Sequence, residues 1–182
     1  MSKRTAVFFD RDGVINEMVD RGDGLVLAGK IVRLTAPWRL SELKIRAHAA
    51  AAIAAVKERG YLAILATNQP DVVYGALTEV TYQEIHREIE KLGLDDVWAC
   101  RHGRDDGCSC RKPKPGLLLE AARKWNIDLK RSFFVGDMET DMQTAKAAGC
   151  RGVLMRAPCN THVYGDYAIA HLRELLPLVA LA

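Results

Sequence analysis

Several features that would place the chain in a common class are missing from its 182 residues. No apolar run approaches the roughly 18 residues of a membrane span. The first segment, MSKRTAVFFDRDG, reaches Asp10 after too short an apolar run for a signal peptide. We therefore expect a cytoplasmic protein with no membrane partner. Repeats, low-complexity tracts and linkers are also missing, which predicts a single domain over residues 1–182.

Charge of one sign is not in large excess either. The chain has 26 Lys plus Arg and 23 Asp plus Glu, and its net charge is +3. Such a small imbalance does not predict a protein that binds polyanions over its whole surface, so any preference for anions must be local. The hydrophobic fraction of 49% is enough for a substantial core.

The five cysteines lack the patterns of a disulfide framework or a redox pair. Their number is odd, and no two of them have the Cys-x-x-Cys spacing of a dithiol motif. Three of them lie with a histidine inside ACRHGRDDGCSC, at residues 99–110. This grouping favours a metal site over a disulfide scaffold.

What the sequence does contain is an alternation of strand and helix patterns. Apolar runs at residues 5–9, 61–69, 132–137 and 151–155 predict buried strands, and YAIA at 167–170 predicts a short one. Helices are expected at 46–59, at 115–125, at 140–149 and at the C-terminus. One more is expected to begin at a capping box of Thr81 and Glu84 and to end at Gly93. The pattern predicts an α/β fold with a doubly wound, Rossmann-like parallel sheet flanked by helices.

Polar side chains follow three of these strands where each one ends. They are Asp10 and Asp12 after the first strand, Thr67 after the second and Asp137 after the third. Ligands of doubly wound sheets bind outside the carboxyl ends of the strands, so we expect one shared site. Carboxylates this close repel each other unless a cation lies between them, and Mg²⁺ is the natural partner. Asp141, one helical turn after Asp137, is expected to brace the site.

The ligands at residues 99–110 predict a second metal. Cys100, His102, Cys108 and Cys110 supply three thiolates and one imidazole, a set that favours tetrahedral Zn²⁺. All four positions would be filled by the protein, so the zinc would be structural. An iron site or scattered loop cysteines are the alternatives.

Four segments together resemble the motifs of the haloacid dehalogenase (HAD) phosphatases, in the usual order. They are DRDGV at 10–14, Thr67 after an apolar strand, Lys112, and GDxxxD at 136–141. The resemblance covers nearly the whole chain and implies a phosphomonoester hydrolase that depends on Mg²⁺ and works through an aspartyl-phosphate.

Each motif residue takes a role from this resemblance. Asp10 would be the nucleophile, and Asp12 the general acid and base. Thr67 would hold a phosphoryl oxygen, and Lys112 would neutralise charge on the phosphoryl group and on Asp10. Asp10, the Asp12 backbone carbonyl and Asp137 would bind Mg²⁺. Asp141 would stand behind them without binding the metal.

The cysteine cluster followed by CRKPKPG resembles one subgroup, which contains the heptose bisphosphate and histidinol-phosphate phosphatases. The resemblance implies a zinc loop at about 99–111 beside the active site, with Arg111 on the substrate. Asn68 and Gln69 are expected to orient the substrate. The segment TNQPDVVYG departs from the subgroup, since Tyr74 stands where an arginine is usual. A flap at about 18–45 is expected in place of a large cap domain.

The substrate that we expect is a small sugar phosphate. The first choice is D-glycero-D-manno-heptose 1,7-bisphosphate, losing its 7-phosphate; histidinol phosphate or another small polyol or sugar phosphate is the alternative. A zinc-stabilised nucleic-acid-binding module is the non-enzyme alternative, and a receiver module phosphorylated on aspartate is a further one. No nucleic-acid partner is expected, and the chain is expected to be a monomer or a small homo-oligomer.

Overall fold

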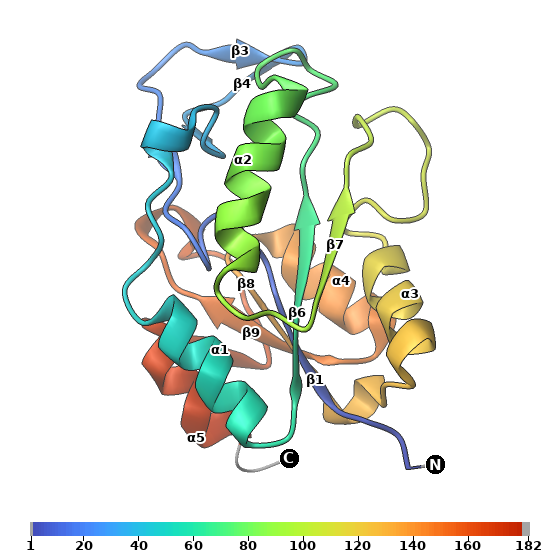
Figure 1. Ribbon diagram of the computed structural model, residues 1–182. Helices are drawn as coiled ribbons and strands as arrows, with labels where there is room; N and C mark the ends of the chain where they lie inside the picture. The colour runs from blue at the N-terminus through green and yellow to red at the C-terminus, as the bar shows by residue number, and fades with distance from the viewer. Residues whose placement is uncertain (1, 180–182) are drawn as a thin grey trace.

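A six-stranded parallel sheet forms the centre of the molecule, in a computed structural model that describes residues 2–179 (Figure 1). The strand order is β10-β9-β8-β1-β6-β7, and every neighbouring pair is parallel. The strands are β1 (Ala6–Phe9), β6 (Leu62–Asn68), β7 (Asp96–Cys100), β8 (Phe133–Gly136), β9 (Arg151–Met155) and β10 (Tyr167–Ile169). This arrangement confirms the predicted doubly wound α/β fold.

Helices cover both faces of the sheet, as Figure 1 shows. In β1, Val7 and Phe9 enter one core with residues of α1 (Ala49–Glu58) and α5 (Leu175–Val179). Ala6 and Phe8 point the other way, into a core with α3 (Gly116–Trp125) and α4 (Glu139–Ala148). Because strand side chains alternate, the continuous apolar run of β1 is buried on both faces. Short 3-10 turns lie at Leu40–Glu42, Leu129–Arg131, Pro158–Asn160 and Leu172–Glu174.

The flap consists of four two-residue strands in place of a cap domain. β2 (Val19–Asp20) pairs with β5 (Leu34–Thr35), and β3 (Val26–Leu27) pairs with β4 (Lys30–Ile31). In Figure 1 the β3–β4 hairpin lies at the top, beyond the carboxyl ends of β1 and β6. The expectation of a flap without a large cap is confirmed.

An ion pair anchors the base of the flap. Arg21 donates to both carboxylate oxygens of Glu42, at 2.8 and 2.7 Å, and stacks over the ring of Trp38 at 4.1 Å. The Trp38 backbone N–H donates to Glu42 as well. Trp38 and Leu43 pack against Tyr82 of α2 (Glu79–Glu90), so the flap rests on this helix.

Three predictions about the elements need correction. Strand β7 was not predicted, because DVWAC is only partly buried over most of its length and lacks a continuous apolar run. Helix α2 begins three residues earlier than predicted, because its cap is Thr78 and not Thr81. The side chain of Thr78 accepts a hydrogen bond from the N–H of Thr81. Helix α1 begins at Ala49 and not at residue 46, since His48 before it has a φ of +68°.

No helix in residues 2–179 is long and apolar enough to cross a membrane.

Candidate active site

The predicted strand-end residues meet at one edge of the sheet. Asp10 directly follows β1, and its N–H donates to Val135 of β8 at 2.8 Å. Thr67 lies near the end of β6, and Asp137 directly follows β8. Because these parallel strands are neighbours, their ends open onto a single cavity of about 270 Å³ that is lined by Asp10, Thr67 and Asp137. Flap residues, among them Leu27 and Val32, line this cavity as well.

Lys112 lies at the bottom of this cavity between two acids. Its Nζ is 2.8 Å from Asp10 Oδ1 and 2.7 Å from Asp141 Oδ1, and it donates to the Ala66 carbonyl at 3.2 Å. The Lys112 side chain is only 2% exposed. Burial alone would lower the pKa of Lys112, but the charges of Asp10 and Asp141 outweigh burial and raise it. The ammonium group therefore stays charged and fixed next to Asp10.

Three acids form a group that can hold a metal ion. Oxygens of Asp10, Asp137 and Asp141 lie within 4.8 Å of one another. Burial is the main cause that raises the pKa of Asp10 to about 6, against the opposing charge of Lys112. Burial also raises the pKa of Asp137 to about 8, with the Asp10 charge adding to it. Within the described residues, Asp137 Oδ1 is buried and has no hydrogen-bond partner.

The backbone at Gly13 makes room for these acids. Gly13 has a φ of +85°, and a Cβ built on it would lie 2.1 Å from Asp137 Oδ2. A side chain at this position would therefore displace Asp137 from the group. The unpartnered oxygen and the close carboxylates fit a hard divalent cation, because a cation would relieve the repulsion that raises both pKa values.

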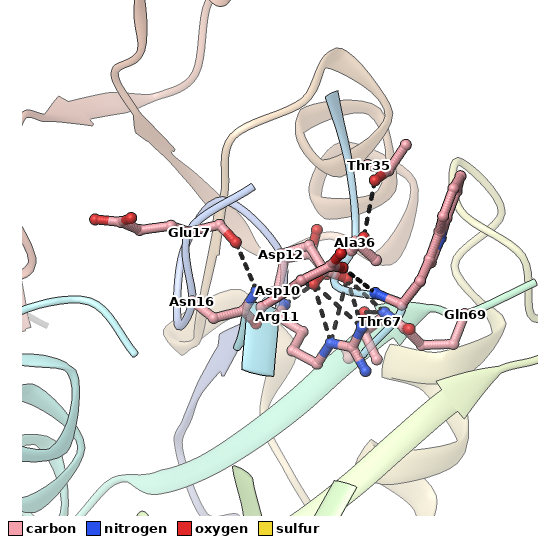
Figure 2. A network of polar contacts seen from close by, with 12 residues as sticks. Asp10, Arg11, Asp12, Asn16, Glu17, Thr35, Ala36, Thr67 and Gln69 are labelled. Atoms are coloured by element: carbon pink, nitrogen blue, oxygen red, sulfur yellow. Dashed lines mark hydrogen bonds and ion pairs between the residues drawn. The ribbon is translucent and has the colours of Figure 1, made fainter. Parts of the chain in front are cut away.

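Asp12 is held by three side chains, which Figure 2 shows converging on its carboxylate. Arg11 donates from Nε at 3.2 Å and from Nη2 at 3.1 Å, Asn16 donates at 3.0 Å, and Gln69 donates at 2.6 Å. Gln69 also donates to Thr67 Oγ1 at 3.0 Å. These donors fix the direction in which Asp12 points.

Sequence reasoning missed Arg11, although it stands between the two acids of the DRDG motif. Its side chain is 1% exposed and forms an ion pair with Asp12 at 3.0 Å. A fully buried arginine needs a charged partner, so its position inside a two-acid motif was the available signal.

The residues predicted to contact substrate make protein contacts in this structure. Asn68 Oδ1 accepts from the Lys112 N–H at 3.1 Å, and Asn68 Nδ2 donates to the Lys112 carbonyl at 3.2 Å. Asn68 thus positions Lys112, while Gln69 positions Asp12. Arg111 donates to the His102 carbonyl at 3.1 Å and also lines the cavity. Contact of these three residues with a substrate stays a prediction.

The cysteine cluster is brought together as its spacing predicts. Sγ of Cys100 lies 3.7 Å from Sγ of Cys108 and 3.2 Å from Sγ of Cys110, and His102 Nδ1 lies 3.5 Å from Cys100 Sγ. A tetrahedral zinc with bonds of about 2.3 Å to sulfur separates its sulfurs by about 3.8 Å. All five cysteines are free thiols, and burial raises the pKa of Cys110 to about 12. The four donors therefore fit one tetrahedral metal ion.

A second, basic cavity of about 600 Å³ adjoins the first. The two share residues on their walls, among them Arg104, Arg111 and Lys112. Lys30 of the flap and Lys114 complete five basic side chains around the second cavity, and no acid lies among the described residues that line it. This cavity suits an anionic group at some distance from Asp10.

Acids and a threonine at the ends of parallel strands, with a buried lysine beside them, define a class, the HAD-like hydrolases. A family model described as HAD-hydrolase-like matches residues 109–162. The D-glycero-beta-D-manno-heptose-1,7-bisphosphate 7-phosphatase of Bordetella bronchiseptica is 33% identical over 150 residues, which cover 79% of this chain and 76% of that protein. The phosphatase of the same name from Rhodopseudomonas palustris is 36% identical and covers 82% of each chain. The chain belongs to this family of HAD-like phosphatases.

A solved structure agrees with this assignment. The D,D-heptose 1,7-bisphosphate phosphatase of B. bronchiseptica, in a complex with magnesium and phosphate, matches with a TM-score of 0.80 at 27% identity. The match covers 97% of this chain and 98% of that one. The predicted resemblance to HAD phosphatases, and the prediction that the chain is a phosphatase enzyme, are confirmed.

Proposed function

We propose that this chain is a Mg²⁺-dependent phosphatase that removes one phosphate from a small sugar bisphosphate, D-glycero-D-manno-heptose 1,7-bisphosphate being the first candidate. The observation that carries the proposal is the Asp10–Lys112–Asp141 group beside Asp12 in one cavity. The names of the relatives and the magnesium and phosphate in the neighbouring structure support it. The proposed residues all line one edge of one sheet, which supports a single catalytic domain over residues 1–182.

Asp10 is the proposed nucleophile, through its Oδ2. Its other oxygen, Oδ1, accepts from the Arg11 N–H at 2.7 Å and pairs with Lys112 at 2.8 Å, which holds the carboxylate at a fixed angle. Oδ2 attacks phosphorus, the bond from phosphorus to the sugar oxygen breaks, and an aspartyl-phosphate forms. Lys112 offsets negative charge on the phosphoryl group, and Thr67 donates to one of its oxygens.

Asp12 moves the protons. In the first step its carboxylic acid donates a proton to the sugar oxygen that leaves. In the second step its carboxylate accepts a proton from the water that attacks the aspartyl-phosphate, which restores the acid for the next cycle. Arg11, Asn16 and Gln69 aim the group in both steps.

Mg²⁺ is the proposed ion at the three-acid group, with Asp10, Asp137 and the Asp12 carbonyl as ligands, and it would supply positive charge for the phosphoryl oxygens. Asp141, paired with Lys112, is proposed to support the site without binding the metal. Zn²⁺ is the proposed ion at Cys100, His102, Cys108 and Cys110. It would fix the loop that leads into Arg111 and Lys112.

The basic second cavity favours a substrate with two phosphates. Lys30, Arg104 and Arg111 surround a space that adjoins the reaction cavity, so the phosphate that is retained would lie there while the other meets Asp10. This arrangement distinguishes a bisphosphate from histidinol phosphate, which has one phosphate.

The test is phosphate release from a panel with and without Mg²⁺: heptose 1,7-bisphosphate, the heptose monophosphates, fructose 1,6-bisphosphate and histidinol phosphate. We expect the highest kcat/KM for the heptose bisphosphate and no turnover without Mg²⁺. Lys30 lines the second cavity and not the reaction cavity, so Lys30→Ala should raise KM for the bisphosphate about tenfold and leave KM for monophosphates unchanged. Lys130→Ala is the exposed control. Equal kcat/KM values for bisphosphates and monophosphates would contradict the substrate proposal.

A further inference from the structure

Asp71 is a buried acid in the reaction cavity to which the proposed chemistry gives no task. It lies in the segment TNQPDVVYG, between β6 and α2, and it is 7% exposed. Its side chain lines the same cavity as Asp10 and Asp12. The loop is closed by its backbone: the Asp71 carbonyl accepts from the N–H groups of Ala76 and Leu77 at 2.9 and 3.2 Å. The turn therefore does not require the carboxylate.

The surroundings of Asp71 compensate its charge poorly. Burial raises its pKa above the usual range, and the charge of Asp12 raises it further. The indole of Trp38 and the charges of Arg11 and Arg111 act in the opposite direction. Within residues 2–179, however, the buried Trp38 Nε1 makes no hydrogen bond. The buried Trp38 N–H, which lies near this carboxylate, therefore still has hydrogen-bonding capacity unused, and that is costly in a protein interior.

The sign of its charge limits what Asp71 can bind. A carboxylate repels phosphate, so Asp71 does not belong to the sites of the two phosphates, which are surrounded by Lys112 and by the basic second cavity. A carboxylate has acceptor positions on two oxygens and no donor, and neighbouring hydroxyl groups of a polyol match it well. Such hydroxyls are the neutral, donor-rich part of a sugar phosphate.

We propose that Asp71 is a specificity-determining residue, whose carboxylate accepts hydrogen bonds from sugar hydroxyls and so selects polyhydroxylated phosphates over phosphates without hydroxyls. The inference rests on the proposed phosphatase function and adds the recognition of the uncharged part of the substrate. Asp71 touches no reacting atom, so its effect belongs to binding and not to the chemical steps.

The experiment compares Asp71→Ala and Asp71→Asn with the wild type on ligands with and without hydroxyls. For heptose 1,7-bisphosphate, Asp71→Ala should lower kcat/KM about 10- to 100-fold, mainly through KM, as expected when hydrogen bonds to a charged group are lost. Asp71→Asn keeps one acceptor oxygen and should lie between the two. For p-nitrophenyl phosphate kcat/KM should stay within about threefold, and the inhibition constant of inorganic phosphate should be unchanged or lower. Asp23→Asn, at an exposed flap position, is the matched control.

Other results of this experiment would overturn either the inference about Asp71 or the proposed function. If both variants weaken inorganic phosphate and p-nitrophenyl phosphate as much as the heptose bisphosphate, Asp71 is a brace for the cavity and the inference is wrong. Unchanged kinetics on every ligand would also overturn it. If Asp71→Ala does not fold, Asp71→Asn, which has the same shape, decides on the same comparison. If the wild type releases no phosphate from any sugar phosphate in the presence of Mg²⁺, it is the proposed function that fails.

Discussion

The reaction centre and the two segments that surround it are built in different ways. Asp10, Asp137 and Lys112 are almost fully buried, and each is fixed by a strand end or by an ion pair inside the protein. The flap and the cysteine loop are largely exposed, although some of their side chains, such as Trp38 and Cys108, pack against apolar neighbours. Their local anchors are the Arg21–Glu42 pair and the four potential zinc ligands. The core thus positions the reacting residues, whereas separate local anchors position the segments that control access to them.

This difference predicts which properties a substitution changes. A change at the centre should abolish turnover with little effect on how the segments around it are arranged. A change at an anchor should leave the chemistry possible but alter stability and substrate binding. Substitutions at the two kinds of position therefore test whether the core and the local anchors act separately.

The largest effect is expected for Asp10→Asn. Asn has the same shape but is a poor nucleophile, so kcat should fall at least about a thousandfold, as when other covalent nucleophiles are removed. The measurement is phosphate release under saturating heptose bisphosphate, together with the melting temperature of the variant. Asp23→Asn, whose side chain is 92% exposed, should retain full activity. Wild-type turnover by a folded Asp10→Asn protein would show that another group attacks phosphorus.

The next effect concerns the cysteine loop. Elemental analysis should find about one zinc per chain, and Cys108→Ser should abolish zinc binding. Loss of the metal should lower the melting temperature by at least about 5 °C, equivalent to about 2 kcal/mol for a chain of this size. It should also lower kcat/KM for the bisphosphate about tenfold, because Arg111 follows the loop directly. Cys159→Ser, at an exposed free thiol, should change neither property. A folded wild-type protein without zinc would contradict the proposed zinc site.

A smaller effect is expected at the flap anchor, with a defined pH dependence. Arg21 lowers the pKa of Glu42 to about 2, from 4.5 in the unfolded chain. The stability from this pair is therefore fully present above pH 4.5 and is lost as the pH falls from 4.5 to about 2. Glu42→Gln should lower the free energy of unfolding by about 1 kcal/mol at pH 7, since both side chains are partly exposed.

The check is chemical denaturation of wild type and Glu42→Gln between pH 7 and pH 2. The difference between them should disappear toward the acid end. Asp20→Asn removes the exposed Arg33 pair of the same flap and should cost less than about 0.5 kcal/mol. If the two variants are equally destabilised, the Arg21–Glu42 pair is not the anchor of the flap.

The same comparison explains how much could be predicted from the sequence. At the centre, apolar runs that end in Asp10, Thr67 and Asp137 predict both the sheet and the meeting point of these residues, because parallel strands bring their carboxyl ends together. Lys112 lies far from them along the chain, and its place was predicted only from the resemblance to a family. The cysteine spacing predicts the cluster because its members are near neighbours in sequence.

What the sequence did not predict depends on contacts between distant segments. Asp71 resembles an ordinary loop residue until the structure shows that it is buried. Strand β7 forms by pairing with β6, and this contact cannot be predicted from a five-residue segment of mixed polarity. Asn68 and Gln69 were predicted to orient the substrate, and this stays a prediction; the hydrogen bonds of their amides to Lys112 and Asp12 were not predicted. A local sequence pattern predicts that a polar residue lies at the end of a strand. It does not predict which group that residue will bind.

The smallest effect tests the corrected start of α2, the helix on which the flap rests. The sequence predicts Thr81 as the cap, but it is the side chain of Thr78 that accepts a hydrogen bond from a backbone N–H at the helix start, at 3.2 Å. Thr78→Ala should lower the free energy of unfolding by about 1 kcal/mol. Thr81→Ala should cost a few tenths of a kcal/mol at most, because it removes only a hydroxyl contact with Thr78. Urea denaturation of both variants decides, and a larger loss for Thr81→Ala would restore the start predicted from the sequence. Since α2 contacts the flap and not the reaction centre, kcat should be the same in both variants and in the wild type.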